Sequence, residues 1–286
     1  MTEGLSFDRE AIASARDRFF APVGRRPVIM GIVNVTPDSF SDGGLFASRE
    51  AAIAQARRLT AEGADIVDVG AESTRPGHTP VPAKEEWARL EPLIEALVRE
   101  AGVPVSIDTY KAVTARRALS VGVAVVNDIW GLQRDSDMAS AIAEAGAGVV
   151  VMHNREAIEP EIDILSDMLR FFERSLTIAR RAGVSETHIA LDPGVGFGKS
   201  RQQNYEALRA VPQLRRLGFP LLIGVSRKSI FKDLPDGRVE GRLVGTIAAN
   251  LIAAEDGAQI FRVHDVAEHR AAFGVFSTLR GAQAKG

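Results

Sequence analysis

Val28-Ile29-Met30-Gly31-Ile32-Val33-Asn34 is an apolar run that ends at a polar side chain. Apolar runs without polar alternation are typical of parallel strands that are covered on both faces. Seven further apolar runs follow, and each leads into residues able to do chemistry. These runs are Asp65–Val69 before Glu72, Val105–Ile107 before Asp108, Val123–Val126 before Asn127 and Asp128, Val149–Met152 before His153, Ile189–Leu191 before Asp192, Leu221–Val225 before Ser226 and Lys228, and Ile260–Val263 before His264.

The stretches between these runs carry apolar residues at three- and four-residue spacing, which predicts helices. Eight strands that alternate with helices predict an α/β protein with a (β/α)₈ barrel, which gathers the ends of its parallel strands on one face. An open, doubly wound sheet is the rival, but it would concentrate polar strand ends at one switch point. The predicted helices are 7–20, 49–62, 84–100, 111–121, 137–145, 162–182, 201–217, 241–255 and 266–279.

The chain of 286 residues has the size of one such barrel, and no linker divides it. We expect residues 1–26 to form an N-terminal extension that closes the barrel bottom, and residues 27–281 to form the barrel. The net charge of −2 argues against nucleic-acid and anionic-membrane partners. The chain has no cysteine, which excludes disulfides and thiolate metal sites and is compatible with the cytoplasm. No apolar run approaches the roughly 20 residues of a membrane span.

One glycine-rich segment needs a separate interpretation. Gly198-Lys199-Ser200 is similar to the end of a phosphate-binding loop, but the glycine required five positions earlier is Pro193. Gly194-Val195-Gly196 opens like a dinucleotide fingerprint, but the third glycine position is Lys199. A flexible strand-to-helix loop after Asp192 is the favoured interpretation.

Seven motifs in order resemble the signatures of the dihydropteroate synthase family. The resemblance implies a barrel that joins 6-hydroxymethyl-7,8-dihydropterin diphosphate to 4-aminobenzoate, a step of folate synthesis and a sulfonamide target. The motifs are Met30-Gly31-Ile32-Val33-Asn34-Val35-Thr36-Pro37-Asp38-Ser39-Phe40-Ser41-Asp42-Gly43-Gly44, Glu72-Ser73-Thr74-Arg75-Pro76-Gly77, Ser106-Ile107-Asp108-Thr109, Asn127-Asp128-Ile129, Leu191-Asp192-Pro193-Gly194-Val195-Gly196-Phe197-Gly198-Lys199, Ser226-Arg227-Lys228-Ser229 and Arg262-Val263-His264-Asp265-Val266.

A pterin edge carries an amino group, ring N–H donors and a carbonyl, so its recognition needs carboxylate and amide acceptors and a cation. Asp108, Asn127, Asp192 and Lys228 supply that set from four strand ends, and Met152 matches a methionine that packs on the pterin. Taken singly, Asp108 or Asp192 could cap the following helix, and Lys228 could be a solvated lysine. Their joint occurrence favours a pterin site.

A departing diphosphate needs fixed cations and a metal. Arg262 and His264 lie two apart on the last strand and should point the same way, near the usual phosphate site of barrels. His264 alone could equally be a buried, hydrogen-bonded histidine. Asn34 and Thr74 match family positions at the diphosphate, and the resemblance implies Mg²⁺ as cofactor with Asn34 as a ligand.

The resemblance also implies that C–O cleavage precedes attack by the amine of 4-aminobenzoate. Lys228, Asp108 and Asp192 would then be catalytic, with the two carboxylates stabilising a cationic dihydropterin. The loops 36–44 and 72–77 contain glycine and serine with few apolar anchors, so we expect them to be mobile and to order around diphosphate. The residues expected at 4-aminobenzoate or on these loops are Phe40, Asp42, Arg75, Pro76 and Ser226. A homodimer is implied by the resemblance alone, while the cytoplasmic expectation comes from the composition.

Two other functions compete with the synthase. A corrinoid-linked methyltransferase would keep the pterin contacts but has no reason to keep Ser226-Arg227-Lys228 and Arg262-Val263-His264 for a diphosphate. A non-catalytic paralogue should have lost Asp42, Thr74 or Arg75, and all three are present. The chain departs from the family after Met152-His153, where the shorter, charged segment Asn154–Ile158 has no role assigned by the sequence.

Overall fold

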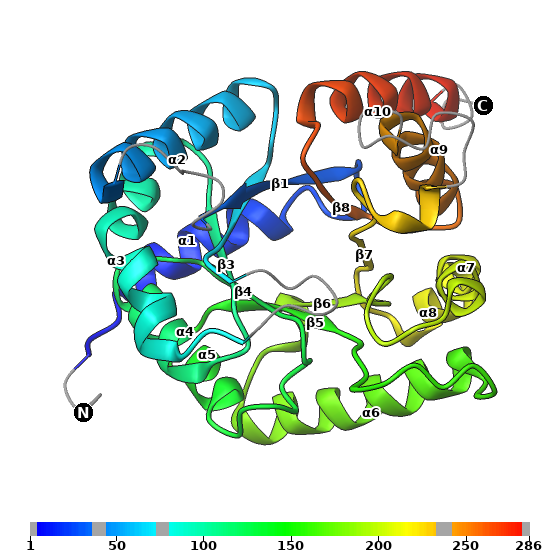
Figure 1. Cartoon of the computed structure of the whole chain (residues 1–286), viewed down its shortest axis with the longest axis horizontal. Coiled ribbons are helices and arrows are strands. Elements are labelled where there is room, and N and C mark those ends of the chain that lie inside the picture. Colours follow the sequence, from blue (N-terminus) through cyan, green and yellow to red (C-terminus); the bar gives the residue numbers. More distant parts are fainter. Residues whose placement is uncertain (1–4, 36–43, 73–79, 233–241, 282–286) are drawn as a thin grey trace.

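The computed structural model describes residues 5–35, 44–72, 80–232 and 242–281, and they form a ring of helices around parallel strands (Figure 1). The strands are hydrogen-bonded in the order β6-β5-β4-β3-β2-β1-β8-β7, and every pair is parallel. A single bridge between Leu191 and Leu221 closes the sheet into the expected barrel. The strands are β1 Val28–Asn34, β2 Ile66–Gly70, β3 Val105–Asp108, β4 Val125–Asp128, β5 Gly148–Met152, β6 Ile189–Asp192, β7 Leu222–Ile223 and β8 Ile260–Val263.

Helices separate the strands, as the apolar spacing predicts. The main difference concerns residues 201–217, which form three short pieces rather than one helix. Pro212 lies in the first turn of the second piece, and a proline cannot continue a helix that has begun earlier in the chain. The helices are α1 Arg9–Phe20, α2 Gly44–Ala61, α3 Ala83–Glu100, α4 Ala112–Ser120, α5 Met138–Ala145, α6 Ile164–Ala182, η2 Glu186–His188, α7 Arg201–Arg209, α8 Val211–Leu214, η3 Arg215–Leu217, η4 Ser229–Phe231, α9 Arg242–Glu255 and α10 Val266–Gly281.

β7 is also shorter than the predicted Leu221–Val225, because only Leu222 and Ile223 pair with β8. The strand ends at Ile223, and the polar residues Ser226, Arg227 and Lys228 follow a few positions later.

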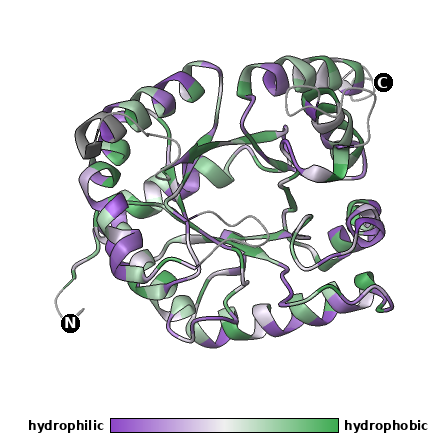
Figure 2. Cartoon of the chain, viewed as in Figure 1, coloured by the Kyte–Doolittle hydropathy of each residue, from purple (hydrophilic) through white to green (hydrophobic). Residues whose placement is uncertain are grey.

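The core has two layers. Side chains that point into the barrel pack together with Phe19 of α1, which is fully buried, and the other faces of the strands pack against the outer helices. Hydrophobic residues accordingly follow the strands while hydrophilic ones gather on the helices (Figure 2). The inner layer consists of Phe19, Val28, Met30, Ile66, Ala124, Val125, Val150, Ala190, Leu222 and Ile260.

Phe19 thus connects α1 to the barrel interior, and burying a phenylalanine contributes about 1.5–3 kcal/mol. The division into an extension at 1–26 and a barrel at 27–281 stays a prediction. Within the described ranges, no helix combines the length and the apolar character that crossing a membrane requires.

Candidate active site

The polar ends of the strands meet at one end of the barrel. Asp108 ends β3 and Asn127 lies near the end of β4, and the two are register partners. Met152 and Asp192 end β5 and β6 and are also register partners. Four of the residues predicted to bind a pterin therefore line the same rim, from four neighbouring strands.

Asp68 is the centre of a buried polar network that the sequence analysis missed. Its side chain is fully buried on β2, and its Oδ1 accepts a hydrogen bond from the Ser106 hydroxyl at 2.6 Å. Its Oδ2 accepts from Nδ2 of Asn127 at 3.0 Å and from Nε of Arg262 at 2.6 Å. The available signal was one charged residue inside an otherwise apolar strand, because such a residue is rarely buried without partners.

Arg262 bridges Asp68 and Asp108 across the barrel. Its Nη2 donates to Oδ2 of Asp108 at 2.7 Å, while its Nε serves Asp68. The guanidinium has five N–H donors, and these two bonds use two of them. Arg262 is therefore fixed by carboxylates in this structure, and it lies among the residues predicted to bind the pterin.

Asp108 presents an unused acceptor to this site. Its Oδ1 is buried and has no hydrogen-bond partner among the residues that the structure describes. Burial raises the pKa of Asp108 to about 7, against the lowering effect of Arg262, and Asp68 raises it further. Asp108 does not cap the next helix, whose N-cap residue is Lys111 and which has no side-chain cap. A buried carboxylate oxygen without a donor needs an explanation, and an N–H group of a ligand would supply one.

Asp192 and Lys228 form a second pair of opposite charges at the rim, close enough to Arg262 to interact with it. Oδ1 of Asp192 accepts the N–H of Gly194 at 2.7 Å. Nζ of Lys228 donates to the carbonyl oxygen of Val195 and lies 4.5 Å from the centre of the Phe197 ring. Burial lowers the pKa of Lys228 to about 8, while Asp192 opposes that shift; burial raises the pKa of Asp192, while Lys228 opposes that shift.

Ser226 and His264 contact each other, although the sequence assigns them to different halves of the substrate. The Ser226 hydroxyl lies 2.9 Å from Nδ1 of His264 and accepts the backbone N–H of His264 at 3.1 Å. Arg227 between Ser226 and Lys228 has a φ of 58° and forms an ion pair with Asp265. This pairing holds the ends of β7 and β8 together.

Asn34 is half-buried at the end of β1, beside Gly70 of β2. Its predicted role as a metal ligand is untested, and within the described ranges no group of three His, Cys, Asp or Glu residues could hold a metal ion. The remaining predicted residues, Phe40, Asp42, Thr74, Arg75 and Pro76, lie outside the described residues.

Asp128, next to Asn127, has a structural role. Its buried carboxylate accepts the backbone N–H groups of Trp130 at 2.8 Å and Leu132 at 2.7 Å, which fixes the turn after β4. Burial raises the pKa of Asp128 to about 6, against those hydrogen bonds. Since Leu132 has a φ of 67°, the carboxylate stabilises a turn that a non-glycine residue rarely adopts.

Comparison with known proteins places this site in a family. Residues 30–264 match the family described as pterin binding enzyme. The chain is 44% identical over 241 residues to the dihydropteroate synthase of Bacillus subtilis, covering 84% of each chain. A dihydropteroate synthase of Clostridium difficile, solved in the presence of pteroic acid, has a TM-score of 0.87 and 47% identity over 90% of this chain and 98% of that one. One of Xanthomonas albilineans, in complex with 7,8-dihydropteroate, has a TM-score of 0.81 and 41% identity over 89% of this chain and 94% of that one.

Proposed function

The chain belongs to the dihydropteroate synthase family, and from that membership we propose that it condenses 6-hydroxymethyl-7,8-dihydropterin diphosphate with 4-aminobenzoate at the rim described above. The products are 7,8-dihydropteroate and diphosphate. The observation that carries this proposal is the unpartnered, buried Oδ1 of Asp108, which lies beside Arg262 in a polar pocket. A pterin supplies the amino and ring N–H groups that such an oxygen requires.

The pterin edge then meets acceptors from Asp108, Asn127 and Asp192 and donors from Lys228. Asn127 is oriented for this role because its amide nitrogen already donates to Asp68. Met152 is buried at the end of β5 and supplies an apolar contact for the ring. This division of labour, with few polar groups fixing orientation and apolar contacts supplying area, is typical of small-molecule sites.

The diphosphate lies toward β8 in this proposal, near His264 and the N–H groups of Arg262 that the carboxylates leave available. Mg²⁺ usually keeps several waters and binds substrate phosphates with only one or two protein oxygens. One amide oxygen from Asn34, at the rim and half-buried, fits that requirement. Bound Mg²⁺ would neutralise negative charge on the diphosphate as it leaves.

In the reaction, the C–O bond to diphosphate breaks and its electron pair leaves with the diphosphate. Asp108 and Asp192 stabilise the positive charge that develops on the dihydropterin, because both carboxylates are buried where charge interactions are strong. The amine of 4-aminobenzoate forms the new C–N bond and loses a proton to solvent water. Lys228 and Ser226, two positions apart after β7, orient the incoming amine together with Phe40, Arg75 and Pro76.

We further propose a homodimer through the outer faces of α9 and α10. Val244 and Ile252 on α9 and Val275 and Leu279 on α10 are each more than 60% exposed, and each pair is spaced so that it lies on one helix face. Exposed apolar residues gathered on two neighbouring helices are typical of an interface between chains. A cytoplasmic location is also part of the proposal, supported by a chain without cysteine.

The proposal is tested by incubating the pure protein with the pterin diphosphate, 4-aminobenzoate and Mg²⁺ and measuring 7,8-dihydropteroate and diphosphate. We expect the two products in equal amounts, and none when either substrate is omitted. A folded protein that binds the pterin but releases no diphosphate would indicate a non-catalytic paralogue instead. The corrinoid alternative predicts methyl transfer between a methyl-pterin and a corrinoid, and no condensation.

A further inference from the structure

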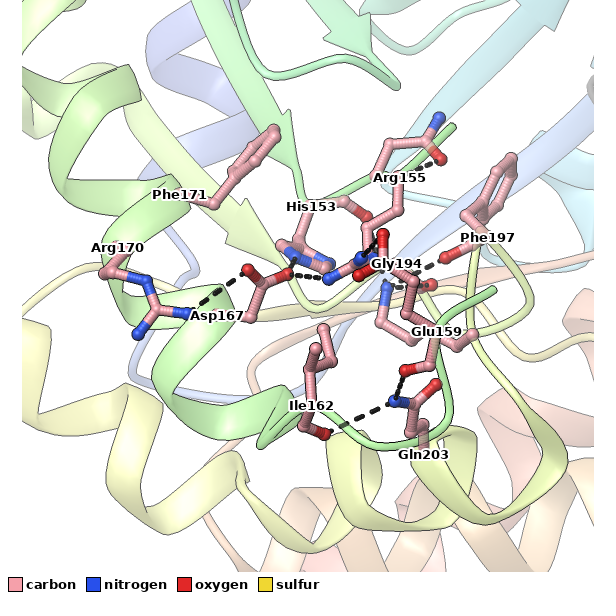
Figure 3. A network of polar contacts seen from close by, with 12 residues as sticks. His153, Arg155, Glu159, Ile162, Asp167, Arg170, Phe171, Gly194, Phe197 and Gln203 are labelled. Atoms are coloured by element: carbon pink, nitrogen blue, oxygen red, sulfur yellow. Dashed lines mark hydrogen bonds and ion pairs between the residues drawn. The ribbon is translucent and has the colours of Figure 1, made fainter. Parts of the chain in front are cut away.

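Lys199 is a buried lysine that the proposed chemistry does not use. Only 4% of its surface is exposed, and its ammonium group is surrounded by backbone carbonyl oxygens. It donates to the oxygens of Gly194 at 2.8 Å, Phe197 at 3.1 Å and His153 at 3.4 Å. Figure 3 labels the three residues whose carbonyl oxygens accept these bonds, His153, Gly194 and Phe197. Three carbonyl groups from two segments are therefore oriented by one side chain.

The loop from 194 to 199 is consequently fixed, in contrast to the flexible loop that the sequence suggested. The turn at Gly194 has a φ of 65°, and a Cβ atom there would overlap the carbonyl oxygen of His153. A Cβ atom at Gly198 would overlap Arg155 in the same way. These close approaches require glycine, and they allow the loop to pack directly against the segment that follows β5.

The loop from 194 to 199 contacts two of the predicted catalytic residues, Asp192 and Lys228. The N–H of Gly194 holds the carboxylate of Asp192, and the carbonyl oxygen of Val195 accepts from Lys228. The Phe197 ring lies beside the same ammonium group. A change in the loop would therefore move Asp192 and Lys228 together.

The segment after β5 is equally fixed. His153 is fully buried, with Nε2 3.1 Å from Asp167 of α6, and Arg155 donates to the same carboxylate at 2.8 Å (Figure 3). The backbone N–H of His153 also donates to the carbonyl oxygen of Asp192 at 2.9 Å. Lys199 thus joins the loop to the segment after β5, which His153 and Arg155 anchor to Asp167 of α6. This gives a role to Arg155 in the charged segment where the sequence departs from the family.

Packing alone does not account for a lysine here. An apolar side chain of the same length would fill the volume without dehydrating a charge, and burial lowers the pKa of Lys199 to about 7. The gain from the cation is the orientation of three carbonyl groups, which an apolar side chain cannot provide.

We propose that Lys199 is a positioning residue for the pterin half of the reaction, because its contacts with the carbonyls of Gly194, Phe197 and His153 set the loop that places Asp192 and Lys228. This inference rests on the proposed function. The diphosphate half is assigned to Arg262 of β8 and to His264 directly after that strand. The hydrogen bonds of Lys199 go to Gly194, Phe197 and His153, so the diphosphate half should be insensitive to Lys199.

The test measures the affinities of 6-hydroxymethylpterin and, separately, of Mg²⁺ with inorganic diphosphate, for the wild type, Lys199→Gln and Lys199→Met. The titrations are done below pH 7, where Lys199 is protonated; there the number of N–H donors falls from three to two to none in this series. We expect pterin affinity to fall in the same order, by about tenfold or more for Lys199→Met, while diphosphate affinity stays within twofold. If Lys199→Met does not fold, Lys199→Gln decides by the same criteria.

Asn250→Leu provides the matched control. Asn250 of α9 is fully buried and forms a hydrogen bond with His269 of α10 at 3.0 Å, away from the loop. Its replacement should lower the stability of the protein without changing pterin affinity relative to diphosphate affinity. Unchanged pterin affinity in a folded Lys199 variant, or equal losses for both ligands, would overturn the inference. A wild-type protein that binds no pterin would instead refute the proposed function.

Discussion

Removing the charge of Asp68 should disturb the site, although the proposed function assigns Asp68 no contact with a substrate. Asp68 serves three donors, from Ser106, Asn127 and Arg262, and all three bonds are inside the barrel. Asp68→Leu keeps the branched shape, with larger methyl groups in place of the oxygens, but leaves these donors without an acceptor. Asp68→Asn keeps an oxygen for Asn127 and Arg262, and the Ser106 hydroxyl can turn to accept from the new amide.

The expected magnitudes follow from these bonds. Breaking a buried ion pair by removing one partner costs about 3–5 kcal/mol, so Asp68→Leu should lower the free energy of unfolding by that amount. In Asp68→Asn the main loss is one charge-assisted hydrogen bond to Arg262, which contributes about 1.5–3 kcal/mol. Pterin affinity should fall most in Asp68→Leu, because the amide of Asn127 loses the carboxylate that orients it.

Urea unfolding and calorimetric titration with 6-hydroxymethylpterin measure the two effects. Asp65→Asn is the control. Asp65 lies directly before β2, at the end of the strand away from the rim, and forms ion pairs with Arg26 at 2.6 Å and Arg270 at 3.0 Å. It should lose stability while keeping its pterin affinity. The reasoning would be refuted by an Asp68→Leu protein as stable as the wild type, or by equal affinity losses in the Asp65 and Asp68 variants.

Three further predictions concern catalysis. Lys228→Ala should nearly abolish turnover in a folded protein, and a near-normal kcat/KM would remove Lys228 from the mechanism. The kcat/KM should be highest between about pH 7 and pH 8. Asp108, with a pKa of about 7, must be ionised, and Lys228, with a pKa of about 8, must be protonated. A flat profile from pH 6 to 9 would contradict this. Mg²⁺ and diphosphate should tighten 4-aminobenzoate binding in the presence of saturating pterin, by about 1–3 kcal/mol; identical affinities with and without them would show that the pocket is preformed.

The strands and the rim could be predicted because two local signals coincide. Parallel strands buried on both faces leave apolar runs in the sequence, and a barrel brings the residue after each run to one end. Asp108, Asn127 and Asp192 follow this rule, and the structure places all three on the rim. The sequence also contains the cause of the helix break at Pro212, but the apolar spacing of residues 201–217 favoured one continuous helix.

Partners could not be predicted in the same way. Arg262 and Asp68 are 194 positions apart, and their ion pair depends on the closure of the barrel rather than on any local pattern. Asp68 was hidden inside an apolar run, and Lys199 inside a glycine-rich segment that is similar to a nucleotide motif. Asp68 and Lys199 are single charged residues, and their roles depend on which carbonyl, carboxylate and amide groups surround them after folding.

The central claim is that Oδ1 of Asp108 receives an N–H group of the pterin. The most direct measurement is the affinity of 6-hydroxymethylpterin for the wild type and for Asp108→Asn, at a pH above 7 where the carboxylate is ionised. The substitution keeps the shape but removes the charge, and a charge-assisted hydrogen bond contributes about 1.5–3 kcal/mol. We therefore predict a loss of about 10- to 150-fold in affinity. An affinity within twofold of the wild type, in a folded Asp108→Asn protein, would contradict the account.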